Sequence, residues 1–209
     1  MAQSFRGTLE KVYVGWDVWV TCTSHAFSTE KQEIMGLLLG RWPQAEELES
    51  LLKEKEQQQQ QGKEEEEAEE GEGGGIYNDA ASAAILAAAE EMVGRVAVVE
   101  HAIILARNDR RKDRVEVGYD QLAEASELAE AHSRDTGREC RVIGWYHSHP
   151  HITVEPSHVD VRTQGQYQAM DPAFIGLIFS VFAQVCSNPP TLAVASLQFR
   201  FTFHVYPHR

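Results

Sequence analysis

Two histidines one residue apart, His147 and His149, lie near the end of an apolar run that Pro150 closes. In a strand, alternate side chains lie on one face, so both imidazoles point the same way, roughly 7 Å apart along the backbone. Such a pair can bind one zinc ion at about 2.0–2.1 Å per nitrogen. A turn over the residues between Pro150 and Pro156 could return Asp160 as a third ligand. Three protein ligands leave the fourth tetrahedral position to water, so the spacing predicts a catalytic metal site.

Ser157 and Asp160 also fit a purely structural role, because S-x-x-D before a helix is a capping arrangement. The two roles can coexist, since a helix start places its side chains at the mouth of a site. The joint pattern H-S-H-P, six residues, then S-x-x-D is far more specific than either part. His151 and His158 flank this pattern without a same-face partner. Surface or satisfied core positions are expected for His25, His101, His132, His204 and His208.

Metal-assisted hydrolysis also needs a carboxylate that takes up and delivers a proton. Glu33, Glu155 and Asp171 are the candidates, and spacing alone does not choose between them. Signatures of other hydrolases are missing, since the chain has no H-E-x-x-H, no P-C-x-x-C and no G-x-S-x-G. The cysteines, Cys22, Cys140 and Cys186, are far apart and odd in number, which is typical of small buried side chains rather than of a disulfide framework.

The 209 residues are expected to form one domain over 1–209, with a low-complexity acidic insertion at about 43–75. That insertion holds 12 of the 32 acidic and 3 of the 19 basic residues, and we expect it to be solvated, although residues 46–56 could form a transient helix. The remainder is only mildly acidic, which argues against a nucleic-acid-binding face. No apolar run reaches 18 residues and no secretory signal is evident, so a soluble, intracellular protein is expected.

Hydrophobic periodicity predicts a mixture of strands and helices. Val12 to Cys22 alternates as a strand would, whereas Asp17 could cap a helix running to about His25, and the pattern leaves both open. The other expected strands are 34–39, 95–106, 115–117, 140–147, 174–182 and one or two within 191–206, with a turn at 108–114. The expected helices are 120–136, with Asp120 as cap and Gly137 as stop, and 157–170. The alanine-rich residues 80–92 fit either a short helix or a continuation of the insertion. Without steady β-α-β alternation, this order favours an α+β or mixed α/β fold over a doubly wound sheet.

The pattern from His147 to Asp160 resembles the JAMM motif of the MPN+ metalloproteases, which remove ubiquitin or ubiquitin-like proteins. Further stretches are similar to the lysine-63-specific deubiquitinases of this family, namely 25–37, 109–115, 141–164 and 174–182. The resemblance covers most of the chain outside residues 43–92.

This resemblance implies the roles of five residues. His147, His149 and Asp160 would bind one Zn²⁺ ion, Glu33 would be the general base for the zinc-activated water, and Ser157 would help to stabilise the tetrahedral oxyanion. The implied fold is an MPN/JAMM domain, a central, mostly antiparallel sheet flanked by helices, with a helix directly after the first strand.

The resemblance also implies an activity, a setting and partners. The implied reaction is hydrolysis of isopeptide bonds in lysine-63-linked polyubiquitin, in nucleus and cytoplasm. A catalytically silent MPN− subunit within a larger complex would order the active site. A non-catalytic MPN scaffold and a JAMM isopeptidase for another ubiquitin-like modifier are the alternatives.

Three features depart from the expected family pattern. Glu155 lies where an apolar or aromatic residue is expected, and it adds a carboxylate near the metal ligands. The acidic insertion is longer than expected. The chain ends at Arg209, soon after the last expected strand and without the C-terminal helical region through which the family contacts its partner.

Overall fold

A computed structural model describes residues 9–53, 79–105, 118–183, 193–196 and 202–206. Its centre is a sheet in which the described strands follow the order β6-β5-β4-β2-β3-β1-β7. The strands are β1 Lys11–Gly15, β2 Met35–Arg41, β3 Val96–Ile104, β4 Arg141–Pro150, β5 Ile175–Val181, β6 Ala193–Ser196 and β7 Thr202–Tyr206. The helices are α1 Trp16–Ala26, α3 Asp79–Met92, α4 Tyr119–Thr136 and α5 His158–Met170, together with a helical segment over 45–53.

The strand pairings make the sheet mixed rather than mostly antiparallel. β1 pairs in parallel with both β3 and β7, and β4 pairs in parallel with β5. The contacts of β2 with β3 and β4, and of β5 with β6, are antiparallel. The α+β class is therefore confirmed, while the predicted dominance of antiparallel pairing is wrong because β1 and β5 each lie beside a strand of the same direction.

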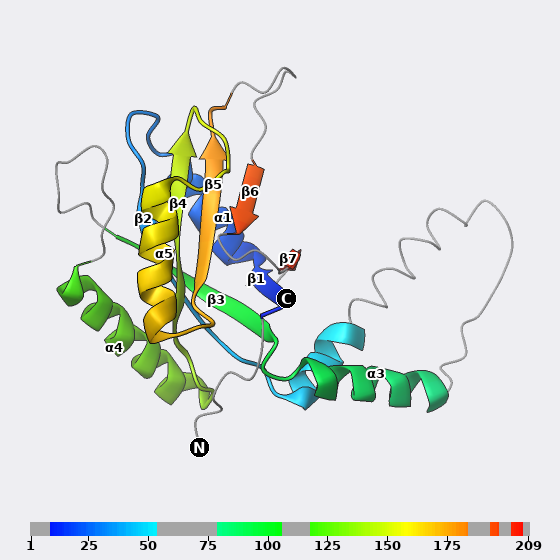
Figure 1. The fold of residues 1–209 in the computed structure, drawn as a ribbon. Helices are drawn as coiled ribbons and strands as arrows, with labels where there is room; N and C mark the ends of the chain where they lie inside the picture. The colour runs from blue at the N-terminus through cyan, green and yellow to red at the C-terminus, as the bar shows by residue number, and fades with distance from the viewer. Residues whose placement is uncertain (1–8, 54–78, 106–117, 184–192, 197–201, 207–209) are drawn as a thin grey trace, which may run out of the picture.

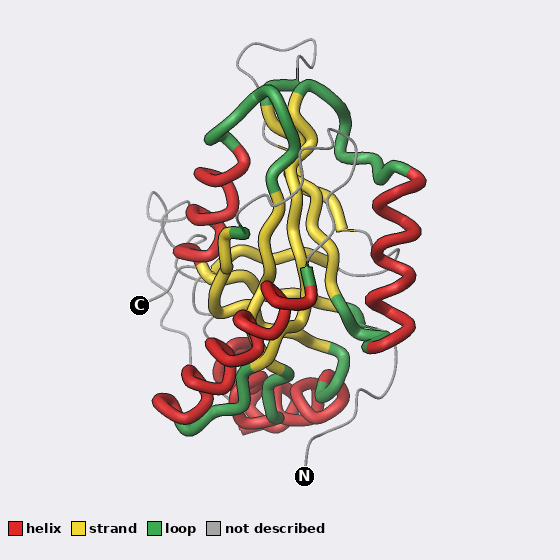
Figure 2. The backbone as a smooth tube through the Cα atoms, turned by 90° about the vertical axis from the view of Figure 1, so that its left-hand side faces the viewer, coloured by secondary structure: helices red, strands yellow, loops and turns green. Residues whose placement is uncertain are grey.

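Helices cover both faces of the sheet, as Figure 1 and the edge-on view of Figure 2 show. On one face, α1 packs through Val18, Cys22 and Ala26 against residues that include Tyr146. On the opposite face, Ala125 of α4 packs with Trp145 in a second core cluster, beside Tyr167 of α5. Consecutive residues of β4 therefore contribute to opposite cores, and the strand is buried on both faces.

The first strand and helix settle the ambiguity at 12–22. The chain leaves β1 at Gly15 and enters α1 at once, in agreement with the family resemblance and against the all-strand interpretation. The alternating apolar residues suggested a strand because the pattern continues from β1 into α1. Within α1, some residues are buried in one core cluster, while the apolar side chains of Trp16 and Val20 stay exposed.

Most of the remaining predicted elements are confirmed, with two corrections and one gap. Helix α4 begins after Gly118, so Asp120 lies in its first turn and is not the cap; Gly137 ends the helix in the left-handed region, with φ 68°. Residues 45–53 of the expected solvated insertion are helical, and Leu48 there is buried against Tyr13 and Val98. The turn and strand predicted for 108–114 and 115–117 lie outside the described residues. Within the described residues, no helix has the length and apolarity needed to cross a membrane.

Candidate metal centre

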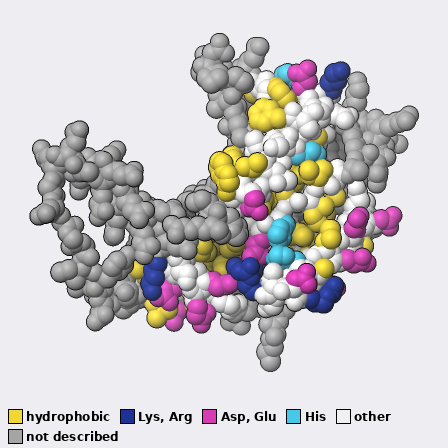
Figure 3. Space-filling view, turned by 180° about the vertical axis from the view of Figure 1, so that it is seen from behind, with side chains coloured by type: hydrophobic (Ala, Val, Ile, Leu, Met, Phe, Trp, Pro, Cys, Tyr) yellow, Lys and Arg dark blue, Asp and Glu magenta, His cyan; other side chains and the backbone are white. Residues whose placement is uncertain are grey.

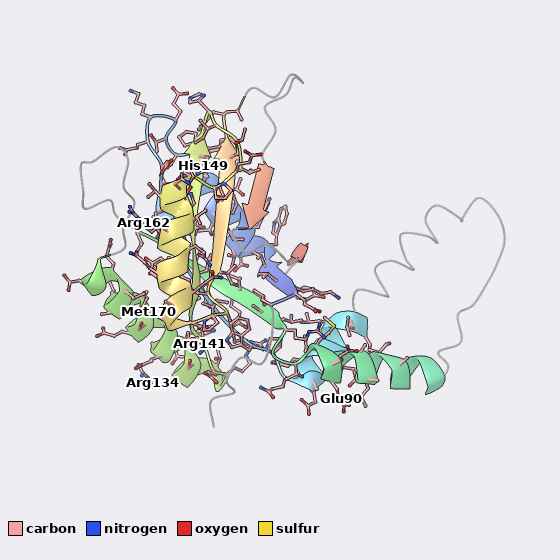
Figure 4. All side chains as sticks on the ribbon, viewed as in Figure 1. Glu90, Arg134, Arg141, His149, Arg162 and Met170 are labelled. Atoms are coloured by element: carbon pink, nitrogen blue, oxygen red, sulfur yellow. The ribbon has the colours of Figure 1, made fainter. Side chains whose placement is uncertain are left out.

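Three side chains from two elements converge at the carboxyl end of β4. His147 and His149 share the face of β4 that also carries Trp145, and Asp160 lies in the first turn of α5. All three residues are buried. Figure 4 shows His149 at this end of β4, beside the start of α5, and Arg141 at the other end of the strand. The structure thus brings together the three residues that the sequence predicted as ligands.

The donor atoms of the three residues lie at distances compatible with one shared metal ion, and each histidine is paired with a different Asp160 oxygen. The two Nε2 atoms of His147 and His149 lie 3.0 Å apart. Asp160 Oδ1 lies 3.3 Å from Nε2 of His147, and Asp160 Oδ2 lies 3.4 Å from Nε2 of His149. Ligands about 2.0–2.1 Å from a tetrahedral ion are about 3.3 Å from one another. Two imidazole nitrogens and a carboxylate are also donors that zinc accepts, so the residues present fit a metal ion.

The surroundings fix the orientation of both imidazoles. Nδ1 of His149 lies 2.7 Å from the Thr153 carbonyl oxygen and donates to it, which leaves Nε2 with a lone pair for a metal. The ring of His147 stacks on Trp145, with 4.7 Å between centroids and 10° between planes. Gln164 holds that indole, since Trp145 Nε1 donates to its side-chain oxygen at 2.7 Å. The ligands are therefore held in place by packing and by hydrogen bonds before any metal binds.

Ser157 caps α5 and orients Asp160 at the same time. The Asp160 N–H donates to Ser157 Oγ at 3.2 Å, and the Ser157 N–H donates to Asp160 Oδ2 at 2.7 Å. Because Ser157 is exposed and Asp160 is buried, the cap places the serine at the mouth of the site and the carboxylate inside it. As the sequence allowed, the residues that cap α5 also lie at the candidate metal centre.

Electrostatics favour a charged pair at this centre. Burial alone would raise the pKa of Asp160, but hydrogen bonds and charge from His147 and His149 lower that pKa far below its usual range. Burial alone would lower the pKa of His149, yet Asp160, the Thr153 carbonyl and the negative charge of Glu33 raise it overall. A divalent cation bound here would place positive charge beside the Asp160 carboxylate.

Glu33 lies next to the ligands because Ser148 fixes the chain beside it. The Ile34 N–H donates to Ser148 Oγ at 3.0 Å, and the Ser148 N–H donates to the Ile34 carbonyl oxygen at 3.0 Å. Glu33 is half-buried and lies close enough for its charge to act on His149. Two segments 114 residues apart are thus joined at the metal centre.

The other two carboxylates considered from the sequence lie elsewhere. Asp171 caps the far end of α5, accepts from the Ala173 N–H and lies 3.6 Å from Arg141, so a helix of roughly 20 Å separates it from the ligands. Glu155 is exposed in the turn between β4 and α5. The charge of Glu33, by contrast, contributes to the raised pKa of the ligand histidine His149.

Comparisons with known proteins place these residues in a family. Residues 90–173 match the family described as JAB1/Mov34/MPN/PAD-1 ubiquitin protease. Residues 90–173 of the chain therefore belong to the JAB/MPN family.

Three curated relatives are similar over most of this chain. The Lys-63-specific deubiquitinase BRCC36 of Rattus norvegicus is 42% identical over 176 residues, which cover 84% of this chain and 52% of that protein. The Homo sapiens protein of the same name is 42% identical over 186 residues, 88% of this chain and 50% of that protein. The Camponotus floridanus protein is 40% identical over 177 residues, 85% of this chain and 50% of that protein. The chain spans about half the length of these relatives.

Sequence reasoning missed the residues that support this JAB/MPN centre. Ser148 binds the chain beside Glu33. The Thr153 carbonyl accepts from the His149 ring, and Gln164 accepts from the Trp145 indole. Ser148 could have been found, because it is the residue between the two histidines of the motif. The Thr153 contact uses a backbone carbonyl, which leaves no signal in the residue type.

Proposed function

We propose that this chain is a zinc-dependent deubiquitinase that hydrolyses isopeptide bonds in lysine-63-linked ubiquitin chains. The observation that carries the proposal is the convergence of three buried metal-binding side chains, those of His147, His149 and Asp160, close enough to share one ion and beside Glu33. The similarity to proteins named Lys-63-specific deubiquitinase supports the substrate class. When bound, zinc would supply Lewis-acid polarisation of the scissile carbonyl and a lowered pKa for a coordinated water.

Glu33 is the proposed general base. Its carboxylate accepts a proton from the attacking water and delivers it to the amine of the leaving lysine, an effect typically worth about 10²–10⁴-fold. Two hydrogen bonds between Ile34 and Ser148, one to the serine hydroxyl and one between backbone groups, hold the adjacent Glu33 in position for both transfers. A base held in this way needs little reorganisation during the reaction.

Ser157 is the proposed oxyanion-stabilising residue. Its Oγ accepts from the Asp160 N–H, which leaves the hydroxyl hydrogen able to donate to another group, and the residue is exposed at the mouth of the site. A hydroxyl there donates to the oxygen on which negative charge develops.

We also propose that the chain works beside an MPN− partner subunit in a larger complex, in nucleus and cytoplasm. The family resemblance supports this, and so do the exposed apolar side chains of Trp16 and Val20, one helical turn apart on α1. Figure 3 shows apolar side chains together on the face opposite to that of Figure 1, with acidic and basic side chains intermixed near its lower edge.

A linkage panel with controlled metal tests the function. The chain is depleted of metal with a chelator, reloaded with zinc and incubated with ubiquitin dimers of each lysine linkage and with dimers of other ubiquitin-like modifiers, with and without an MPN− subunit. We expect cleavage of the lysine-63 dimer in the zinc-loaded sample and none in the depleted sample. Cleavage that survives depletion would overturn the metal's role. Zinc binding without cleavage under every condition would favour the scaffold, and preference for another modifier would overturn the substrate class.

A further inference from the structure

A second group of metal-binding side chains lies away from the site already described. It consists of Glu100 from β3, His132 from α4 and Cys140, which directly precedes β4; we call it the Glu100–His132–Cys140 cluster. One ligand atom of each residue lies within 4.8 Å of those of the other two. Cys140 is at the opposite end of β4 from His147 and His149, roughly 20 Å away along the strand.

A β-bulge aims Glu100 at this cluster. In the pairing of β2 with β3, Leu39 lies opposite His101 but Gly40 lies opposite Val99, so Glu100 is the extra residue on β3. A bulge interrupts the alternation of side chains, and bulges often re-aim a side chain toward a site. As a result both Glu100 and His101 face His132 of α4, instead of lying on opposite faces of the sheet.

The Glu100 carboxylate is only half satisfied by protein. Its Oε1 lies 2.9 Å from Arg41 Nε and 3.5 Å from an Arg138 nitrogen. Its Oε2 is buried and, among the described residues, has no hydrogen-bond partner; the nearest His132 nitrogen is 3.9 Å away. The side chain is only 9% exposed. A buried carboxylate oxygen without a partner costs about 1–3 kcal/mol or more, which points to a missing ligand on that side.

Cys140 is held by α4 with its thiol within 4.8 Å of a Glu100 carboxylate oxygen. The residue is 5% exposed, and its N–H donates to Ser133 Oγ of α4 at 2.8 Å. Burial, together with the charge of Glu100, raises the pKa of the thiol to about 11, so the free thiol stays protonated. His132 lies one residue before Ser133, and its ring nitrogens lie 3.2 and 3.3 Å from His101 Nε2.

We propose that Glu100, His132 and Cys140 bind a second divalent metal ion of the zinc class, with His101 as the nearest side chain able to complete the shell. Thiolate, imidazole and carboxylate together suit zinc, which is borderline soft, and are a poor set for magnesium or calcium. The ion ties β3, α4 and the start of β4 together and neutralises the unpartnered carboxylate oxygen. Binding releases the thiol proton of Cys140, so affinity rises with pH.

Cobalt distinguishes this site from the catalytic one, because the catalytic ligands include no sulfur. The metal-free 209-residue chain is titrated with Co²⁺ while the near-ultraviolet thiolate-to-cobalt charge-transfer band and the bound cobalt per chain are recorded. We expect two cobalt ions per chain and the band. The His149→Ala variant should keep the band with one cobalt ion, and zinc should raise its Tm by about 5 °C or more at a hundredfold excess over Kd.

Cysteine variants assign the band to its thiol. The matched control is the double variant Cys22→Ala/Cys186→Ala, in which Cys140 is the sole thiol. If this variant keeps the band, the band comes from Cys140. This result requires no substitution at the proposed site, so it does not depend on a variant that could unfold. Cys140→Ala and Glu100→Gln should abolish or weaken the band, with circular dichroism confirming the fold. One cobalt ion per chain without a band, or a band that persists in Cys140→Ala, would overturn the second site while leaving the proposed deubiquitinase activity untouched.

Discussion

At the scale of single residues, Ser148 links the metal ligands to the proposed base. Its side chain points away from the metal, because neighbouring residues of β4 face opposite sides, and there it accepts from the Ile34 N–H. The same serine therefore sets the spacing between His147 and His149 and the position of Glu33. We regard it as a positioning residue rather than a catalytic one.

Replacing Ser148 should separate the spacing of the two histidines from the positioning of Glu33. In Ser148→Ala the Ile34 N–H loses its acceptor, which should cost about 1–3 kcal/mol and release the Glu33 segment. We expect kcat to fall at least tenfold with little change in KM, and one catalytic zinc to be retained. Steady-state kinetics with metal analysis measure this, and Ser148→Thr, which keeps the hydroxyl, should recover activity. A wild-type kcat in Ser148→Ala would contradict the positioning role.

The pairing of His149 with Asp160 should give the metal-free chain a characteristic pH dependence. Because the pKa of His149 is raised on folding, its contribution is complete below about pH 6.5 and is lost as pH rises through the folded value. Because the pKa of Asp160 is lowered, its contribution is present above about pH 3.9 and is lost as pH falls. The pair should therefore stabilise the metal-free chain most between about pH 4 and 6.5.

Thermal unfolding of the metal-free chain across pH 4–9 measures this, with Asp160→Asn as the comparison. The difference in Tm between the two proteins should be largest in the mildly acidic range and should shrink above neutrality. A difference that grows from pH 6 to pH 9 would be inconsistent with the pairing.

At the scale of elements, β2 and β4 must lie close together for the base to meet the metal ligands. Gly36 of β2 lies opposite Tyr146, and a Cβ there would come within 2.2 Å of the tyrosine ring and 2.5 Å of the Ile103 carbonyl oxygen. Tyr146 in turn packs in the α1 core and its hydroxyl lies 2.9 Å from His25 Nδ1. The absence of a side chain at residue 36 lets three elements pack at one point.

Gly36→Ala should destabilise the fold by about 1–3 kcal/mol, because the tyrosine ring and the β3 backbone would both have to shift. The matched control is Gly165→Ala in α5, where a Cβ meets nothing within 4 Å and should stabilise the helix by about 0.5–1 kcal/mol. Urea unfolding of both variants measures the two effects. Equal stability of the two variants would refute the packing argument.

At the scale of the whole molecule, elements with strong local signals were predictable. The continuous apolar runs of β2 and β5 and the glycine stop of α4 depend only on neighbours in sequence. The capping pattern at Ser157 likewise gave the start of α5. The clustering of His147, His149 and Asp160 was predictable for the same reason, since the three lie within 14 residues of one another.

Features that depend on distant segments could not be predicted from local sequence patterns. The parallel partner of β5 and the burial of Leu48 depend on contacts that no local pattern encodes. Choosing Glu33 as the base required the family resemblance, because its segment meets β4 only through pairing over 114 residues. Glu100, His132 and Cys140 come from three segments and a bulge, so each looked like an ordinary residue in the sequence.

The central claim is that Glu33 transfers the proton at a metal centre formed by His147, His149 and Asp160. It is tested most directly by single-turnover cleavage of lysine-63-linked ubiquitin dimer by zinc-loaded Glu33→Gln, with the partner subunit present and with Glu30→Gln as the matched control. Glu30 is an exposed acidic neighbour whose carboxylate lies 3.7 Å from the ring of His151. We predict that Glu33→Gln retains its catalytic zinc and loses about 10²–10⁴-fold in rate, while Glu30→Gln cleaves as the unaltered chain does. Cleavage by zinc-loaded Glu33→Gln at the unaltered rate would contradict the account.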